Sequence, residues 1–203
     1  MKELVASFLF SALSNLFRNQ PDLSSYTEQT LEREPNLSFH FANEIHPYLS
    51  WLRFDCNIAK PHLADRRPDI VFHCRGILDL DCLAVEVKRQ RNPKGIKDDL
   101  KKIRDDWFGE QLRYRFGAGI LIDDVRKTFS GLLLENIADD VPMEFTQGSE
   151  QLWRPVVCAT PEQFKEISNV VGQIAEAEKA NHETGELKLK LDQLVCTLYA
   201  HEK

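Results

Sequence analysis

The sequence lacks the cysteine patterns that zinc sites and disulfide frameworks need. Its five cysteines are odd in number and widely spaced, and no two of them form a CxxC pair. Structural zinc sites use closely spaced thiols, and small secreted domains pair an even set of cysteines. We therefore expect a protein of the reducing cytoplasm with neither a zinc centre nor a disulfide scaffold.

Signature motifs of several enzyme classes are missing as well. The six histidines show no HExxH spacing, no serine stands in a GxSxG elbow, and the chain has no GxxxxGK[ST] loop. These patterns place the metal ligands, the nucleophile or the phosphate cradle of zinc hydrolases, serine hydrolases and P-loop ATPases. Their absence argues against all three classes.

Long apolar runs are also missing, including at the N-terminus. The first seventeen residues, MKELVASFLFSALSNLF, contain Glu3 and three serines, and no small-residue cleavage site follows them. A membrane-spanning helix needs about 20 apolar residues, and a secretory signal opens on positive charge. The apolar residues recur at helical spacing instead. We expect an amphipathic helix that packs on the core or on a partner chain, in a soluble protein without a membrane span.

Composition and charge fit one folded domain and exclude a general DNA-coating protein. The chain has 203 residues, of which 42% are hydrophobic and 29% charged, and its net charge is −6. Proteins that coat nucleic acid without specificity are usually basic. A local basic groove is still compatible with these numbers, because eight cations fall within about thirty residues. They are Arg66, Arg67, Arg75, Lys88, Arg89, Arg91, Lys94 and Lys97. A solvated basic edge explains them equally well.

Hydrophobic periodicity predicts a mixed α/β fold in a single domain spanning residues 1–203. We expect an N-terminal helical segment (1–36), a core (37–122) and a C-terminal helical pair (160–203). The core reads as a helix interrupted near Pro47, three strands at about 53–60, 70–74 and 82–88, a helix at about 93–107 and a strand at 117–122. Beyond it we expect a helix over 125–137 and an edge strand near Pro155. Thr160-Pro161-Glu162-Gln163 then has the pattern of a helix start.

Three charged residues lie within or beside the apolar strands of the core. Glu86 and Lys88 alternate with valines in AVEVK, so both side chains point to one face of their strand. Asp69 opens the preceding strand. If the two strands pair antiparallel with Asp69 opposite Glu86 or Lys88, all three side chains meet, whereas a shift of one residue would separate them.

Such a group suits metal-assisted phosphodiester hydrolysis. Two adjacent carboxylates repel each other unless a cation lies between them. Oxygen ligands favour Mg²⁺ or Mn²⁺ over zinc. A metal ion can activate water and stabilise a phosphoryl transition state, and a neighbouring ammonium can orient the water and offset phosphate charge.

Pro68-Asp69 followed by Glu86-Val87-Lys88 resembles the PD-(D/E)XK signature of the restriction-endonuclease-like phosphodiesterases. The element order of residues 37–122 is also similar to that family's core, helix-strand-strand-strand-helix-strand. The resemblance implies a metal held by Asp69, Glu86 and the carbonyl of Val87, with Lys88 placing the attacking water.

The resemblance also implies further site residues. Glu44 matches an acidic residue often supplied by the family's first core helix, although Pro47 nearby is unusual in a helix. Lys101 or Lys102, on the helix after the signature, match basic residues that meet the phosphate in some members. From the basic cluster we add Arg67 and Arg89 as candidates for binding the substrate.

The leading hypothesis is a Mg²⁺- or Mn²⁺-dependent endonuclease that cuts DNA in a bacterial restriction or defence system or a mobile element. It would act as a homodimer or as a subunit of a larger complex, with the first helix and the C-terminal pair as candidate dimer surfaces. The alternative is a non-catalytic module of the same fold that docks a partner protein or DNA. An RNA-directed nuclease is a third hypothesis, but no basic strand with interleaved aromatics supports it. The C-terminal LKLKLDQLVCTLYA resembles a tail helix of restriction-modification polypeptides, and a helix that closes the core or a dimer explains it as well.

Overall fold

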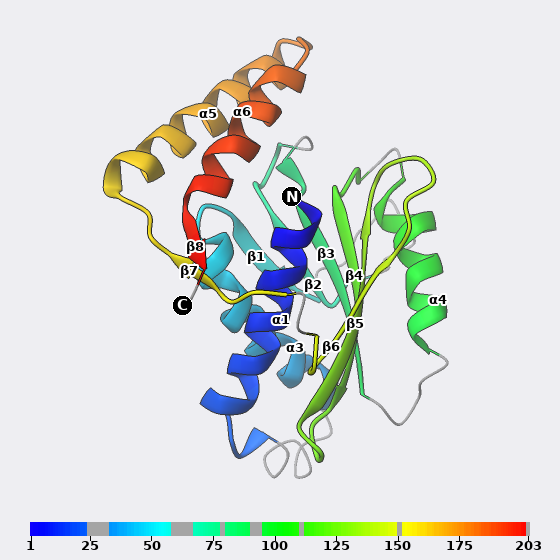
Figure 1. Cartoon of the computed structure of the whole chain (residues 1–203). Helices are drawn as coiled ribbons and strands as arrows, with labels where there is room; N and C mark the ends of the chain where they lie inside the picture. The colour runs from blue at the N-terminus through cyan, green and yellow to red at the C-terminus, as the bar shows by residue number, and fades with distance from the viewer. Residues whose placement is uncertain are drawn as a thin grey trace.

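The centre of the protein is a mixed six-stranded sheet in the order β1-β2-β3-β4-β5-β6 (Figure 1). The computed structural model describes residues 1–23, 33–57, 67–77, 80–89, 95–109, 112–149 and 152–201. The strands are β1 (Arg53–Cys56), β2 (Ile70–His73), β3 (Leu83–Arg89), β4 (Phe116–Asp123), β5 (Thr128–Glu135) and β6 (Met143–Thr146). β3 and β4 are parallel, and every other neighbouring pair is antiparallel.

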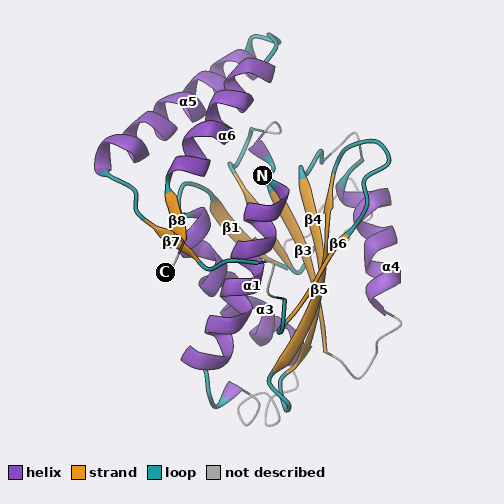
Figure 2. Ribbon diagram, in the orientation of Figure 1, coloured by secondary structure: helices purple, strands orange, loops and turns teal. Residues whose placement is uncertain are grey.

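Helices cover both faces of this sheet (Figure 2). One face carries α1 (Lys2–Asn19) and α3 (Arg33–Ile45), which runs into the 3-10 turn η1 (His46–Leu49). The other face carries α4 (Gly95–Lys102), which continues as one π-helical turn, η4 (Ile103–Trp107). The parallel β3–β4 pair requires a crossover, and α4 lies on it. The expected mixed α/β class is therefore confirmed, and residues 33–123 have the expected order of elements.

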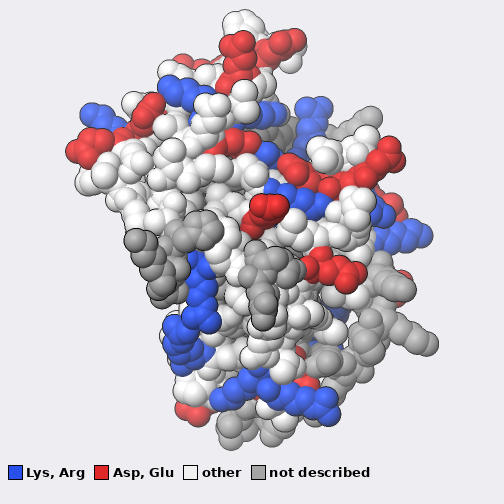
Figure 3. All heavy atoms as spheres, in the orientation of Figure 1, with Lys and Arg blue, Asp and Glu red and all other residues white. Residues whose placement is uncertain are grey.

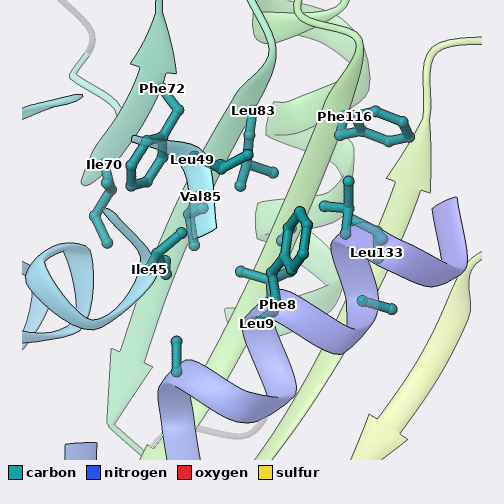
Figure 4. Packing of buried hydrophobic residues seen from close by; sticks show 14 of the residues in the cluster. Phe8, Leu9, Ile45, Leu49, Ile70, Phe72, Leu83, Val85, Phe116 and Leu133 are labelled. Atoms are coloured by element: carbon teal, nitrogen blue, oxygen red, sulfur yellow. The ribbon is translucent and has the colours of Figure 1, made fainter. Parts of the chain in front are cut away.

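The main core lies between the sheet and the α1–α3 layer. Figure 4 shows Phe8 and Leu9 of α1 close to inward-facing side chains of the strands, among them Val85 and Leu133. A smaller apolar cluster fills the opposite side, beneath α4 and η4. Its members are Val71, Ala84, Ile103, Trp107, Leu112, Tyr114 and Leu134.

α1 is buried on most of its circumference, which sequence periodicity did not anticipate. Eleven of its residues are buried, including Ser7 and Ser11 on the side that a two-faced helix would expose. The helix packs against α3, β5, β6 and β7, and Lys2 Nζ binds Asp140 Oδ1 at 2.6 Å. A helix buried on all sides belongs to the interior. Most of the apolar residues of α1 are therefore covered within this chain.

Residues 125–137 do not form the expected helix. They belong to the β4–β5 hairpin and its continuation, in which Asp123 Oδ1 accepts hydrogen bonds from the backbone of Val125 and Arg126. The turn ends at Lys127, with φ of 55°. β5 then pairs along its whole length with β4, and its inward residues are buried by α1. The apolar residues of this leucine-rich segment also fit the spacing of a helix, and its pairing with β4 decided that it forms a strand.

The C-terminal part is a helical hairpin joined to a small second sheet. β7 (Pro155–Val157) pairs antiparallel with β8 (Tyr199–His201), and α5 (Pro161–Lys179) and α6 (Gly185–Thr197) lie between them in sequence. The predicted capping box is present, since Thr160 accepts from the backbone of Gln163 and Gln163 accepts from that of Thr160. The Tyr199 hydroxyl donates to the carbonyl of Tyr48 and so joins the hairpin to the core. Among the described residues, none of the helices is long and apolar enough to cross a membrane.

Candidate functional site

The charged residues of β2 and β3 meet on the α4 face of the sheet. Ile70 pairs with Val85, and the same antiparallel register places Asp69 opposite Glu86. Asp69 lies one residue before β2, where its Oδ2 accepts a hydrogen bond of 2.7 Å from the backbone nitrogen of Val87. This bond extends the hydrogen bonding between β2 and β3 by one residue, with the Asp69 side chain as the acceptor. The register that the sequence required for convergence is the one observed.

Glu86 is buried and tightly held. Its side chain is 1% exposed, and Oε1 lies 2.8 Å from Lys102 Nζ. The indole nitrogen of Trp107 donates to the same oxygen at 2.8 Å. Burial raises the pKa of Glu86 to about 7, and the charge of Asp69 adds to the rise while Lys102 opposes it. A buried carboxylate with a raised pKa beside a second carboxylate is typical of functional sites.

Two glycines of β4 allow the α4–η4 segment to approach the sheet closely. Gly119 pairs with Glu86, and a Cβ placed on it would lie 3.2 Å from the side chain of Ile96. A Cβ on Gly117 would lie 2.2 Å from Cγ2 of Ile103. The glycine-rich start of GAGILI therefore brings the charged side chains of α4 within reach of β3.

A further buried carboxylate, that of Asp99, lies on α4. Asp99 is 7% exposed, and its buried Oδ2 accepts no hydrogen bond within the described residues. Burial raises the pKa of Asp99, while the charges of Lys88 and Lys102 lower it and that of Asp69 raises it further. The charges of three carboxylates and two ammonium groups thus act on one another near the carboxyl end of β3.

Of the predicted basic residues, Lys102 belongs to this group. Lys102, besides binding Glu86, reaches the carbonyl of Arg67 at 3.4 Å and lies 5.3 Å from the centre of the Trp107 ring. Arg67 and Lys101 are exposed, Lys101 on the last turn of α4. Arg66, Arg91 and Lys94 lie outside the described residues, as does the side chain of Lys97.

Arg89 and Glu44 are placed differently from the expectation. Arg89 Nη2 donates to Asp124 Oδ1 at 2.7 Å, and both side chains are nearly buried, so this guanidinium supports the end of β3 and the β4 turn. Glu44 accepts two hydrogen bonds, of 3.0 and 3.1 Å, from Asn19 of α1. The structure does not bring Glu44 to the site, because α3 packs on the opposite face of the sheet.

Sequence patterns missed two contributors. Asp99 lies three residues after Ile96 and four before Ile103, so a carboxylate on the apolar stripe of the helix was visible in advance. Trp107 follows at the same helical spacing, four residues after Ile103, and its indole nitrogen donates to Glu86. A buried tryptophan normally finds an acceptor, but its identity depends on the packing of η4.

The donors at this site fit a hard divalent cation in their chemistry. Asp69, Glu86 and the carbonyl of Val87 offer only oxygen, and Mg²⁺ is usually bound through one or two carboxylates with waters and substrate phosphates. Within the described ranges, no group of three or more His, Cys, Asp or Glu side chains lies close enough to hold a metal ion. A metal would therefore rest on two carboxylates and would compete with the ammonium of Lys102 for Glu86.

Comparisons with protein-family models, with curated proteins and with solved structures found no match for this chain. Function is therefore inferred from the arrangement of the chain's own residues.

Proposed function

We propose that the protein is a metal-dependent nuclease that hydrolyses phosphodiester bonds of DNA, built on a restriction-endonuclease-like core at residues 37–122. The observation that carries the proposal is the convergence of Asp69, Glu86 and Lys88. The β2–β3 register sets the two carboxylates opposite each other, and Lys88 follows Glu86 on the same face. A strand pair that only filled the core would be more stable with apolar residues at these positions.

Each residue has a definable part in this chemistry. Asp69, Glu86 and the carbonyl of Val87 would hold Mg²⁺ or Mn²⁺, which supplies Lewis-acid activation of water and of the phosphoryl group. Lys88 would orient the attacking water and offset charge that develops on the phosphate. The hydrogen bond from the Val87 nitrogen to Oδ2 fixes the orientation of the Asp69 carboxylate.

The surroundings of the site support an anionic substrate. Lys101 and Lys102 lie on the last turn of α4, and Lys102 reaches the carbonyl of Arg67, whereas the chain as a whole is acidic. On the face viewed in Figure 3, which carries α1, acidic and basic groups are interspersed. We place DNA on the opposite, α4 side of the sheet. A homodimer or a larger complex remains a proposal for cutting both strands.

A non-catalytic module is the second candidate, and one observation favours it. Lys102 and Trp107 both bind Glu86 Oε1, so this carboxylate is already satisfied without a metal. A scaffold that keeps the charges as a structural ion pair would look the same. In that case the chain would bind DNA or a partner protein without cutting.

Purified protein incubated with supercoiled and single-stranded DNA tests the proposal. We expect cutting in Mg²⁺ or Mn²⁺ and none in chelator. Lys88→Met should slow it by at least about 100-fold, because a positioned ammonium stabilises the transition state. Lys165→Met, on the exposed side of α5 far along the chain, is the matched control and should cut at the wild-type rate. If no substrate is cut in either metal while DNA is still bound, the module is the correct function.

A further inference from the structure

Glu86 Oε1 is held by two donors that differ in their freedom to move. The indole nitrogen of Trp107 and the ammonium of Lys102 each lie 2.8 Å from this oxygen. Trp107 is fully buried, whereas the side chain of Lys102 is 29% exposed. One donor is therefore enclosed in the interior, and the other can move out toward solvent without unpacking the core.

The place of Trp107 follows from the packing of η4. The residue ends the π-helical turn that continues α4, and it belongs with Ile103 and Tyr114 to the smaller apolar cluster. Gly117 admits Ile103 to the sheet, since a Cβ on this glycine would lie 2.2 Å from Cγ2 of the isoleucine. π-helical turns within α-helices often occur at functional sites. Because the indole is packed in this way, its N–H fixes the place of Glu86 Oε1.

Lys102 supplies the positive charge that the buried Glu86 carboxylate needs. Leaving such a carboxylate without an opposite charge is strongly destabilising. Lys102 meets this need with a single charge on a long, flexible stem. Its ammonium also lies 3.4 Å from the carbonyl of Arg67 and 5.3 Å from the centre of the Trp107 ring. Both groups attract a cation, so they can keep the ammonium close by after it has left Glu86.

We propose that Lys102 is a resident substitute for the divalent cation, which neutralises Glu86 in the metal-free protein and leaves it when Mg²⁺ or Mn²⁺ binds. Trp107 is the positioning residue of this exchange, because its N–H stays on Oε1 and keeps the carboxylate in place for either cation. This inference rests on the metal site of the nuclease function proposed above. The two donors should therefore act in opposite directions on metal affinity.

Mn²⁺ titrations of the purified protein without DNA test the part of Lys102. They are run above neutral pH, because burial raises the pKa of Glu86 to about 7. We expect Lys102→Met to bind Mn²⁺ at least about fivefold more tightly than wild type, since a competing cation has been removed. Arg104→Met removes one positive charge from an exposed position on η4 and should change the Kd by no more than about twofold.

The same titration tests Trp107. Trp107→Phe keeps an aromatic ring in the cluster and removes only the N–H donor. We expect it to weaken Mn²⁺ binding by about 10- to 100-fold, as the loss of a residue that orients a metal ligand does. Trp51→Phe is the matched control, because the Trp51 indole nitrogen is buried and donates to no described residue. Its Kd for Mn²⁺ should equal that of wild type.

Thermal unfolding gives a second readout. Without metal, Lys102→Met should melt at a lower temperature than wild type, because Glu86 has lost its partner. Saturating Mn²⁺ should then raise the melting temperature more in this variant than in wild type. If Lys102→Met is too unstable to titrate, Lys102→Gln, which keeps a donor without the charge, should change metal affinity in the same direction.

The outcomes separate this exchange from the nuclease function. Mn²⁺ binding by both Lys102 variants that is no tighter than in wild type would overturn the exchange, as would an unchanged Kd in Trp107→Phe. DNA cutting by the wild type in those cases would leave the nuclease function standing. The expected pattern of Mn²⁺ binding in a protein that cuts no DNA would support the exchange and overturn the nuclease alone. If neither wild type nor the Lys102 variants bind Mn²⁺, both proposals are wrong.

Discussion

Glu86→Gln is expected to abolish DNA cutting while making the metal-free protein more stable above neutral pH. The pKa of Glu86 is raised by burial to about 7, from an ordinary value of 4.5. The folded protein therefore holds this proton more tightly than the unfolded chain does. The contribution of protonated Glu86 to the free energy of unfolding should be fully present below pH 4.5 and should be lost as the pH rises through about 7.

Glutamine removes this loss because it carries no charge at any pH. Its amide oxygen can still accept from Trp107 and Lys102. At pH 8 without metal, we expect a gain of about 1 to 3 kcal/mol in the free energy of unfolding, from a shift of roughly two pKa units with allowance for relaxation. Between pH 5 and 8 the wild-type stability should fall and that of Glu86→Gln should stay nearly level. Urea unfolding at several pH values measures both.

Adding Mg²⁺ should reverse the order of the two proteins. A cation that binds Glu86 and Asp69 stabilises only the wild type, in proportion to its occupancy. Cleavage should fall by at least about 1000-fold in Glu86→Gln, since a metal ligand is lost. Glu144→Gln, on the exposed face of β6, should change stability by no more than about 0.5 kcal/mol. Equal pH profiles for wild type and Glu86→Gln would show that no buried charge is carried at this position.

Gly117→Val should cause the largest loss of stability among substitutions near the site. A Cβ there would stand 2.2 Å from Cγ2 of Ile103 and 3.1 Å from the ring of Phe108. Cγ2 is attached to the stem of a buried isoleucine, so it cannot move without displacing η4. Overpacking of this kind costs about 1 to 3 kcal/mol, and valine adds two methyl groups to the clash. We expect a loss of about 3 kcal/mol by urea unfolding.

The control for this change is Gly172→Ala. Gly172 lies inside α5, and no described atom is within 4 Å of its Cβ position. Alanine should raise the free energy of unfolding by about 0.5 to 1 kcal/mol through helix propensity. Gly117→Val should also slow cleavage, since α4 carries Lys102, which binds Glu86. A Gly117→Val protein with wild-type stability would contradict the close packing of Ile103.

The strand pair of the site could be predicted because its side chains alternate cleanly. Val85 and Val87 specify one buried face, so Glu86 and Lys88 had to share the other, and a short turn made antiparallel pairing with β2 the natural choice. The capping box at Thr160 and the end of the helix before Pro47 could also be predicted from the sequence. In each of these cases a local rule and the tertiary contacts agree.

Other features depend on contacts that no local pattern encodes. The segment Thr128–Glu135 became a strand because β4 offered an edge to pair with, not because of its own spacing. The ion pair between Glu86 and Lys102 depends on how closely α4 approaches the two glycines of β4. Glu44 was proposed from the family resemblance alone, but it lies on α3, on the face of the sheet opposite the site. Long-range packing decided all three.

The enclosure of α1 has a consequence for how the protein is made. This helix is translated more than a hundred residues before β5 to β7, the strands that cover it. Throughout that interval the apolar residues of α1 can pack on α3 but lack the strands that complete their burial. We accordingly expect that chaperones bind this helix during synthesis, and that folding is completed only after the later strands have left the ribosome.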